Sequence, residues 1–163
     1  NETYLTSLGT PLTNKIATTT WKVGGNAYDT LGSVKPSQSY QYEIVSPRPG
    51  NTSINGETEY AAKIGLMYVS DYGYAANNSG WVKSLQDYGD LKTSNWLYLG
   101  VDETTISRNS GDSTSYFGIS SFGNISYKFY VKYTYAVRPT FSLISSVTYI
   151  SGTGIQSDPI IVN

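Results

Sequence analysis

The side chains of this chain that could carry out acid–base chemistry are three pairs of closely spaced carboxylates. They are Glu57 with Glu59, Asp87 with Asp90, and Asp102 with Glu103. Two carboxyl groups that flank a glycosidic bond can hydrolyse it, one as acid and the other as base or nucleophile. All three pairs fall in polar, loop-like sequence, and the other acids are scattered. Glycan processing is therefore only the third of three functional hypotheses.

Other catalytic chemistry is excluded by residue type. The chain contains no His and no Cys. Nucleophilic catalysis of the Ser-His or Cys-His kind needs an imidazole, and thiol catalysis, disulfides and thiolate metal sites need cysteine. We therefore expect no enzymatic activity.

Oxygen ligands for a metal ion occur in two places. Asn109 and Asp112 with Asp102 form one set, and Asp87 with Asp90 forms the other. Either set could contribute to a Ca²⁺ site, but a loop of regularly spaced acids followed by Gly is absent from the sequence. We expect no cofactor, with Ca²⁺ as the alternative, and interpret these acids as solvated loop residues.

The most prominent feature is a Tyr/Ser/Gly-rich run over residues 113–135 with few charges. Binding surfaces favour Tyr, Ser, Gly and Asn because these residues combine rigid aromatic area with adaptable hydrogen bonding. Over residues 124–137, apolar and aromatic side chains occupy odd positions, which predicts one long strand with its odd face inward. We expect ligand contacts from the even positions and the preceding loops. The candidate residues are Arg108, Asn109, Ser113, Ser115, Tyr116, Ser121, Asn124, Lys128, Tyr130 and Lys132.

Length and composition set the broad class. The 163 residues predict a single domain, residues 1–163, which could be the C-terminal part of a larger surface protein. The formal net charge is −1 and only 14% of residues are charged, so we expect neither nucleic acid nor direct membrane insertion. Low charge with many Ser, Thr, Asn, Gly and Tyr residues is typical of exported proteins. We expect an extracellular location on a bacterial cell surface.

The elements that must position these residues are mostly short. Leucines at helical spacing predict an amphipathic helix over residues 3–16, with Thr3 or Thr6 as N-cap and a break near Gly9-Thr10-Pro11. Residues 24–60 predict turns and loops with a short strand at 40–45. Residues 61–69 predict the best buried strand, followed by Ser70-Asp71 as the N-cap of a helical turn. Further strands are expected at 16–23, 95–99, 103–107, 116–120, 141–143, 147–150 and 159–162, with turns at 109–112 and 152–154. This pattern favours an α+β domain.

Three other residue types have structural interpretations. Arg138 precedes a proline and is expected to form a bidentate pair with a carboxylate or with loop carbonyls. Asp71 is expected to cap a helix rather than bind a ligand. Trp21, Trp81 and Trp96 are expected to pack in the core or at hinges.

Four segments in order carry a family resemblance. They are residues 63–75 (Lys-Ile-Gly-Leu-Met-Tyr-Val-Ser-Asp-Tyr-Gly-Tyr-Ala), 95–99 (Asn-Trp-Leu-Tyr-Leu), 137–143 (Val-Arg-Pro-Thr-Phe-Ser-Leu), and 151–154 with 157–159 (Ser-Gly-Thr-Gly, Ser-Asp-Pro). Together they resemble a family of uncharacterised Firmicutes surface domains, related to formylglycine-generating-type domains and to the variable proteins of diversity-generating retroelements. The resemblance implies a C-type-lectin-like fold and, from the variable proteins, a solvent-facing sheet that binds ligands.

The chain also departs from these relatives. Residues 103–108 lack the Trp and Pro that the family usually carries there. The Glu-Pro-Asn and Trp-Asn-Asp motifs of calcium-dependent lectins are missing, and formylglycine chemistry requires cysteine. The similarity to C-type lectins therefore implies the fold and not their calcium-dependent binding.

Two functional hypotheses rank above the hypothesis that this chain is an enzyme. The first is a non-catalytic, adhesin-like recognition domain that binds a host or bacterial surface glycan or protein through the Tyr/Ser/Asn-rich face. The alternative is a structural, pilin-like or wall-associated subunit that self-associates, since residues 160–162 predict an edge strand able to pair with a second copy.

Overall fold

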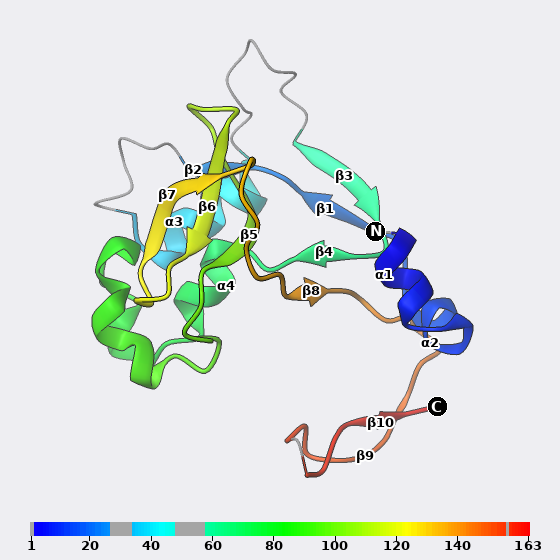
Figure 1. Cartoon of the computed structure of the whole chain (residues 1–163). Helices are drawn as coiled ribbons and strands as arrows, with labels where there is room; N and C mark the ends of the chain where they lie inside the picture. Colours follow the sequence, from blue (N-terminus) through cyan, green and yellow to red (C-terminus); the bar gives the residue numbers. More distant parts are fainter. Residues whose placement is uncertain (1, 27–33, 48–57, 156) are drawn as a thin grey trace.

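A four-stranded sheet and a layer of short helices form the compact part of the molecule (Figure 1). The computed structural model describes residues 2–26, 34–47, 58–155 and 157–163. The sheet has the order β2 (Gly25–Asn26), β5 (Glu103–Asn109), β6 (Ser115–Ile119) and β7 (Ile125–Tyr130). β2 is parallel to β5 and the other pairs are antiparallel. The expected strands at 103–107 and 116–120 are confirmed, and the mixture of helices with short, mainly antiparallel strands is compatible with the α+β class.

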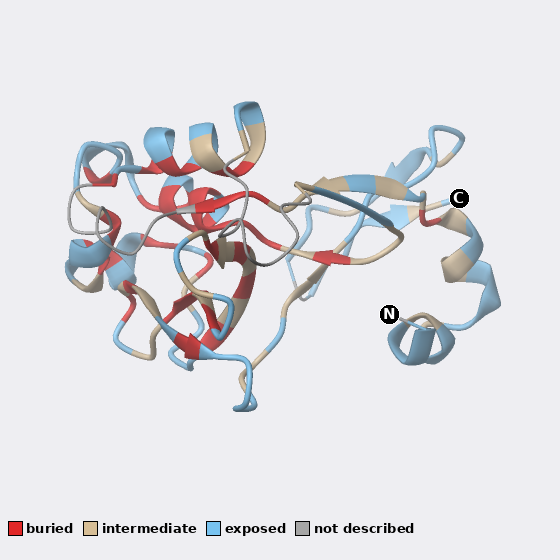
Figure 2. Cartoon of the chain, turned by 90° about the horizontal axis from the view of Figure 1, so that it is seen from above, coloured by how far each residue is buried: buried red, intermediate tan, exposed pale blue. Residues whose placement is uncertain are grey.

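The hydrophobic core lies between this sheet and the helices. The helical segments are α3 (Pro36–Tyr40), a π-helix η2 (Gln41–Val45), α4 (Val69–Tyr74), and the 3-10 segments η3 (Asn78–Gly80) and η4 (Leu85–Ser94). Buried residues of α4 and η4 meet buried residues of β6 and β7. They include Val69, Tyr72, Leu85, Tyr88, Leu91, Phe117, Ile119 and Ile125. Figure 2 shows this concentration of buried residues in the compact part.

An extension leads away from the compact part. It contains two small antiparallel pairs, β1 (Thr19–Lys22) with β3 (Glu59–Ala62) and β4 (Gly65–Leu66) with β8 (Pro139–Thr140). The helices α1 (Glu2–Ser7) and α2 (Thr10–Lys15) lie beyond these pairs. A hairpin of β9 (Tyr149–Ser151) and β10 (Ile161–Val162) stands apart from the compact part (Figure 1).

The expected break in the N-terminal helix is confirmed. Gly9 has a φ of 75° and Pro11 lies in the first turn of α2, where a proline is tolerated because its missing N–H would have no helical partner. Thr3 and Thr6 lie inside α1, so the prediction that one of them is the N-cap was wrong.

Near the C-terminal end, the expected turn at 152–154 is confirmed, with Gly152 and Gly154 both at positive φ. The C-terminal strands are shorter than expected and shifted.

The strand expected at residues 40–45 is helical instead. α3 begins at Pro36 and continues into η2. The cause is a buried carboxylate: Glu43 is fully buried, accepts a hydrogen bond from Ser39 Oγ at 3.0 Å and another from Ser107 Oγ, and so requires a helical turn between residues 39 and 43.

The long buried strand expected at residues 61–69 is divided in three. β3 ends at Ala62, β4 covers two residues, and Val69 already belongs to α4. Gly65 lies against the ring of Trp21, where a Cβ would come within 2.6 Å of ring atoms. The N-cap of α4 is Tyr68 rather than Ser70 or Asp71, but Asp71 does cap the helix, because its carboxylate accepts from the Tyr68 N–H at 2.9 Å.

The strand expected at residues 95–99 is a turn. The Asn95 side chain donates to the Tyr72 carbonyl at 2.8 Å and accepts from the Leu97 N–H at 3.0 Å. This local bond replaces strand pairing, as asparagine side chains often do in turns. Trp96 is consequently 79% exposed, and the expectation that it packs in the core was wrong.

Candidate functional site

The position of the candidate site depends on a bulge in β7. Tyr116 pairs with Phe129 and Gly118 pairs with Ser126, so three residues of β6 stand opposite four of β7. The extra residue moves the later side chains of β7 to the other face of the sheet. Ile125 belongs to the core cluster, whereas Phe129 is buried against Tyr116 and Tyr135, with ring centroids 6.1 Å and 4.7 Å away. The prediction of one odd, inward face is therefore confirmed only for the first half of the strand.

The strand expected at 124–137 also ends early, at Tyr130. Val131, Tyr133 and Val137 are exposed, although the sequence placed them inward. Tyr130 and Tyr133 meet edge to face at 6.4 Å, and Lys132 Nζ lies 5.1 Å from the Tyr133 centroid and 5.9 Å from that of Tyr130. These contacts bring aromatic rings and an ammonium group together at the surface.

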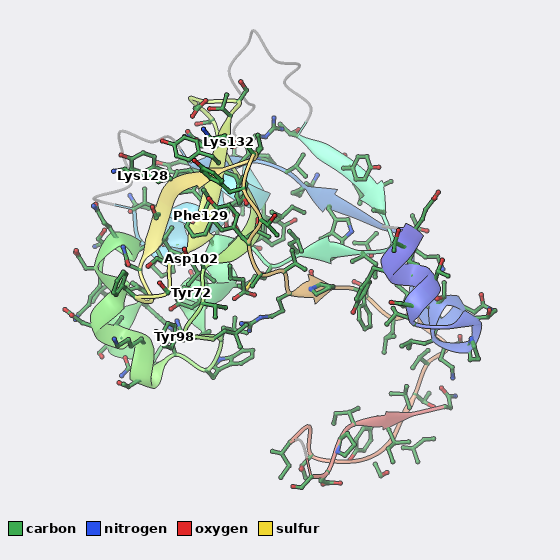
Figure 3. All side chains as sticks on the ribbon, viewed as in Figure 1. Tyr72, Tyr98, Asp102, Lys128, Phe129 and Lys132 are labelled. Atoms are coloured by element: carbon green, nitrogen blue, oxygen red, sulfur yellow. The ribbon has the colours of Figure 1, made fainter. Side chains whose placement is uncertain are left out.

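We call this group the Tyr/Lys surface. It consists of Tyr116, Tyr130, Lys132, Tyr133 and Tyr135. Lys128 lies on the same strand, with its Nζ 5.8 Å from the centroid of the Tyr127 ring. The rings are held in place by one another and by the backbone: Tyr116 and Tyr135 meet edge to face at 6.1 Å, and the Tyr135 hydroxyl accepts from the Tyr130 N–H at 3.3 Å. Figure 3 shows Lys128, Phe129 and Lys132 toward the same end of the sheet, away from Asp102 and Tyr98. Such a surface can stack on the C–H faces of sugars, donate hydrogen bonds, or attract acidic groups.

The β5–β6 turn supports this surface through hydrogen bonds among four residues, Asn109, Asp112, Thr114 and Ser115. Asn109 and Ser115 are buried and bonded to each other at 3.0 Å. Ser115 Oγ also donates to Asp112 at 2.7 Å, and Thr114 donates to Asp112 from both its N–H and its hydroxyl. The Ser115 bond, followed by those from Thr114, lowers the pKa of Asp112. Asn109 and Ser115 therefore stabilise the turn from inside, and Ser113 is exposed beside them.

Arg108 joins the compact part to the extension. It lies on β5 beside β2 and its Nε donates to the Val23 carbonyl. Its side chain is half-buried.

Ser121 and Asn124 lie in the β6–β7 turn, at the opposite end of the sheet from the Tyr/Lys surface. Ser121 donates from its N–H to Asp102 at 2.7 Å and its carbonyl accepts from the Tyr98 hydroxyl at 2.7 Å. The Asn124 carbonyl accepts from the Ser120 N–H at 2.9 Å. Figure 3 shows Asp102 and Tyr98 toward this end. The structure thus brings together eight of the ten candidate residues and separates these two.

The acids of the candidate set Asp102, Asn109 and Asp112 do not converge. Asp102 and the Asn109–Asp112 turn lie at opposite ends of β5, which at about 3.3 Å per residue puts them roughly 20 Å apart. Glu103, next to Asp102, is buried and paired with Arg138. Glu57 lies outside the described residues. Within the described ranges, no group of three or more acidic side chains is placed to hold a metal ion.

The Arg138 interpretation is confirmed. Its Nε and Nη2 donate to the two carboxylate oxygens of Glu103 at 2.9 and 3.0 Å, and Nη2 also donates to the Leu97 carbonyl at 2.6 Å. Burial raises the pKa of Glu103, and the pairing with Arg138 offsets part of this shift.

Two members of the Tyr/Lys surface, Tyr133 and Tyr135, were missed by sequence reasoning, which assigned them to the core. Strict alternation of apolar and polar residues was the only sequence signal for the orientation of these two side chains, and it fails at the bulge.

Comparisons with models of known protein families, with curated proteins and with solved structures found no match to this chain. Among the described helices, none is both long and apolar enough to cross a lipid bilayer.

Proposed function

We propose that this chain is a non-catalytic, adhesin-like recognition domain of a bacterial cell surface that binds a glycan or a protein through the Tyr/Lys surface. The observation that supports this most directly is the contact of Tyr130, Lys132 and Tyr133 at an exposed position. Exposed aromatic rings that are already held in place lose little entropy on binding, and Tyr is enriched among residues that dominate binding energy.

The proposal includes a C-type-lectin-like fold. Two observations support this part: the small α+β arrangement and the order of the four resembling segments along the chain. An extracellular location rests on composition, with 14% charged residues and many Ser, Thr, Asn, Gly and Tyr residues. The contacts of the Tyr/Lys surface require no metal ion, since aromatic and lysine side chains form it.

The test is binding of the purified chain to a glycan and surface-protein array, compared with a Tyr130→Ala/Tyr133→Ala variant. We expect a ligand whose binding falls at least about tenfold, roughly 1.4 kcal/mol, in this variant. Tyr60→Ala is the matched control, because Tyr60 is 64% exposed and lies on β3 in the extension. Equal binding by the double variant would place the ligand elsewhere, and a folded chain without any ligand would favour the structural alternative. Loss of binding in the presence of EDTA would show that ligand binding also requires a divalent cation such as Ca²⁺.

The structural alternative is favoured by the C-terminal hairpin. Tyr149, Ile150, Ile155, Ile160 and Ile161 are each more than half exposed. A two-stranded hairpin is marginally stable alone in water, so a second copy of the chain that covers these residues would stabilise it. This observation supports a self-associating subunit of the pilin-like or wall-associated kind.

A further inference from the structure

A second candidate binding site lies between α4, the 95–99 turn and β8. It is a pocket of about 360 Å³, within the range of small-molecule sites. Met67, Ala75 and Leu97 contribute apolar, buried side chains to its lining. It shares no residue with the Tyr/Lys surface. Its lining comes from three segments that lie far apart in the sequence.

Aromatic side chains form part of the pocket wall. Trp96 is 79% exposed and Tyr74 is 40% exposed. Tyr74 is held by Trp81, which meets it edge to face at 5.4 Å and donates from Nε1 to the Ala76 carbonyl at 3.0 Å. The hydrogen bonds of Asn95 fix the turn that carries Trp96. Folding therefore holds the Trp96 backbone in place while leaving the indole open to solvent.

Polar atoms with spare hydrogen-bonding capacity line the same pocket. Arg138 uses Nε and Nη2 for Glu103 and Leu97, and its Nη1 makes no hydrogen bond to the described residues. Asp71 uses Oδ2 for the Tyr68 N–H, and its Oδ1 makes none within the described part of the chain. The buried Thr140 hydroxyl also has no partner there. The pocket therefore offers both donors and acceptors.

The charges of these groups indicate the ligand. Glu103 neutralises Arg138 through two hydrogen bonds, so the guanidinium attracts an anion weakly and acts as a neutral donor would. Asp71 Oδ1 is an acceptor in the same lining that offers the Arg138 Nη1 donor. A sugar ring matches the Arg138 donor and the Asp71 acceptor, because each of its hydroxyl groups can donate and accept a hydrogen bond. The C–H face of the sugar can also pack on the indole ring of Trp96. We propose that this pocket binds one sugar unit of a neutral glycan.

The test uses isothermal titration of the full chain with glucose, galactose, mannose and N-acetylglucosamine, with choline and acetate as charged probes. Free sugars bind weakly, so titrations extend to about 10 mM, which covers a Kd near 1 mM. We expect one of the sugars to bind, and Trp96→Ala to weaken its binding at least about tenfold. Tyr74→Ala should weaken it as well. Because the Trp96 ring is 79% exposed, Trp96→Ala should keep the melting temperature of the unsubstituted chain. Tyr74→Ala also removes the ring contact with Trp81, so a slightly lower melting temperature is expected for that variant.

Phe122→Ala is the matched control, since Phe122 is 73% exposed and lies outside the pocket lining; it should bind the sugar unchanged. Failure of all four sugars to bind, equal affinity in Trp96→Ala, or binding of only choline or acetate would overturn the proposal. The Tyr130→Ala/Tyr133→Ala variant separates it from the function proposed above. Loss of sugar binding in that variant, with retention in Trp96→Ala, would place the sugar on the Tyr/Lys surface instead.

Discussion

Glu43 is the residue on which several elements depend. Its carboxylate is fully buried in η2 and accepts hydrogen bonds from Ser39 of α3, Ser107 of β5 and the Ser70 N–H of α4. Burial raises its pKa above the ordinary 4.5, and these hydrogen bonds offset part of the shift. The folded chain therefore holds this proton more tightly than the unfolded chain. The stability that protonation adds is fully present below pH 4.5 and is lost as the pH rises through the raised, folded-state pKa.

We accordingly expect the free energy of unfolding to decrease as the pH rises above about 4.5, and Glu43→Gln to remove much of this decrease. Glu43→Ala should lower stability by about 3 kcal/mol, since it leaves three buried donors without an acceptor. Urea denaturation at a series of pH values measures both effects. Glu2→Gln, at an exposed carboxyl, is the control and should retain the slope. An unchanged slope in Glu43→Gln would show that other groups cause it; Glu103, whose pKa burial also raises, would be the first to test.

At the scale of elements, the edge of the main sheet depends on a close backbone approach. β2 contains two residues and pairs in parallel with the end of β5. A Cβ on Gly25 would lie 1.7 Å from the Arg108 carbonyl oxygen. Only a residue without a side chain fits this position, because the obstructing atom belongs to the backbone and cannot rotate away.

Gly25→Ala should therefore destabilise the chain by about 3 kcal/mol, the upper end of the range for overpacking, and detach β2 from β5. Gly111→Ala is the control, since a Cβ there would meet only Asn109 Oδ1 at 3.6 Å. Thermal unfolding measures stability, and amide exchange of β2 and β5 measures the pairing. Equal melting temperatures for the two variants would contradict this interpretation of the edge.

At the scale of the whole molecule, apolar residues are distributed unevenly. The compact part buries its core, whereas the C-terminal hairpin exposes Ile150, Ile155, Ile160 and Ile161 and carries one charged residue, Asp158, among those described (Figures 1 and 2). An exposed, nearly uncharged hairpin with free strand edges is a template for pairing with another chain.

We expect the chain to self-associate with rising concentration, and Ile160→Lys/Ile161→Lys to keep it monomeric, since two buried charges would oppose the contact. Analytical ultracentrifugation measures this. The melting temperature at low concentration should change little, because both residues are about half exposed, at 52% and 51%. A chain that remains monomeric at all concentrations, or a variant that associates equally well, would count against the hairpin as an interface.

Sequence reasoning was most successful where a local feature decides the structure. The helix break at Gly9, the turn at Gly152 and Gly154, and the strands β5 and β6 follow from backbone freedom, proline chemistry and residue preference over a few positions. The pairing of Arg138 was predicted as a type of contact, although its partner Glu103 could not be named.

The sequence by itself determined the absence of His and Cys chemistry, the low charge, the α+β composition and the aromatic richness of the C-terminal third. Only the tertiary structure decided that residues 36–45 are helical, that Phe129 and Ile125 lie on opposite faces of the sheet, and that Trp96 is exposed beside a pocket. In each case the reason is a contact with a distant segment. Glu43 is held by Ser70 and Ser107, the bulge in β7 exists only against β6, and Asn95 bends its turn by bonding to Tyr72. The hydrophobic periodicity of a short sequence segment cannot reveal these contacts, because each one forms with a residue from a distant part of the chain.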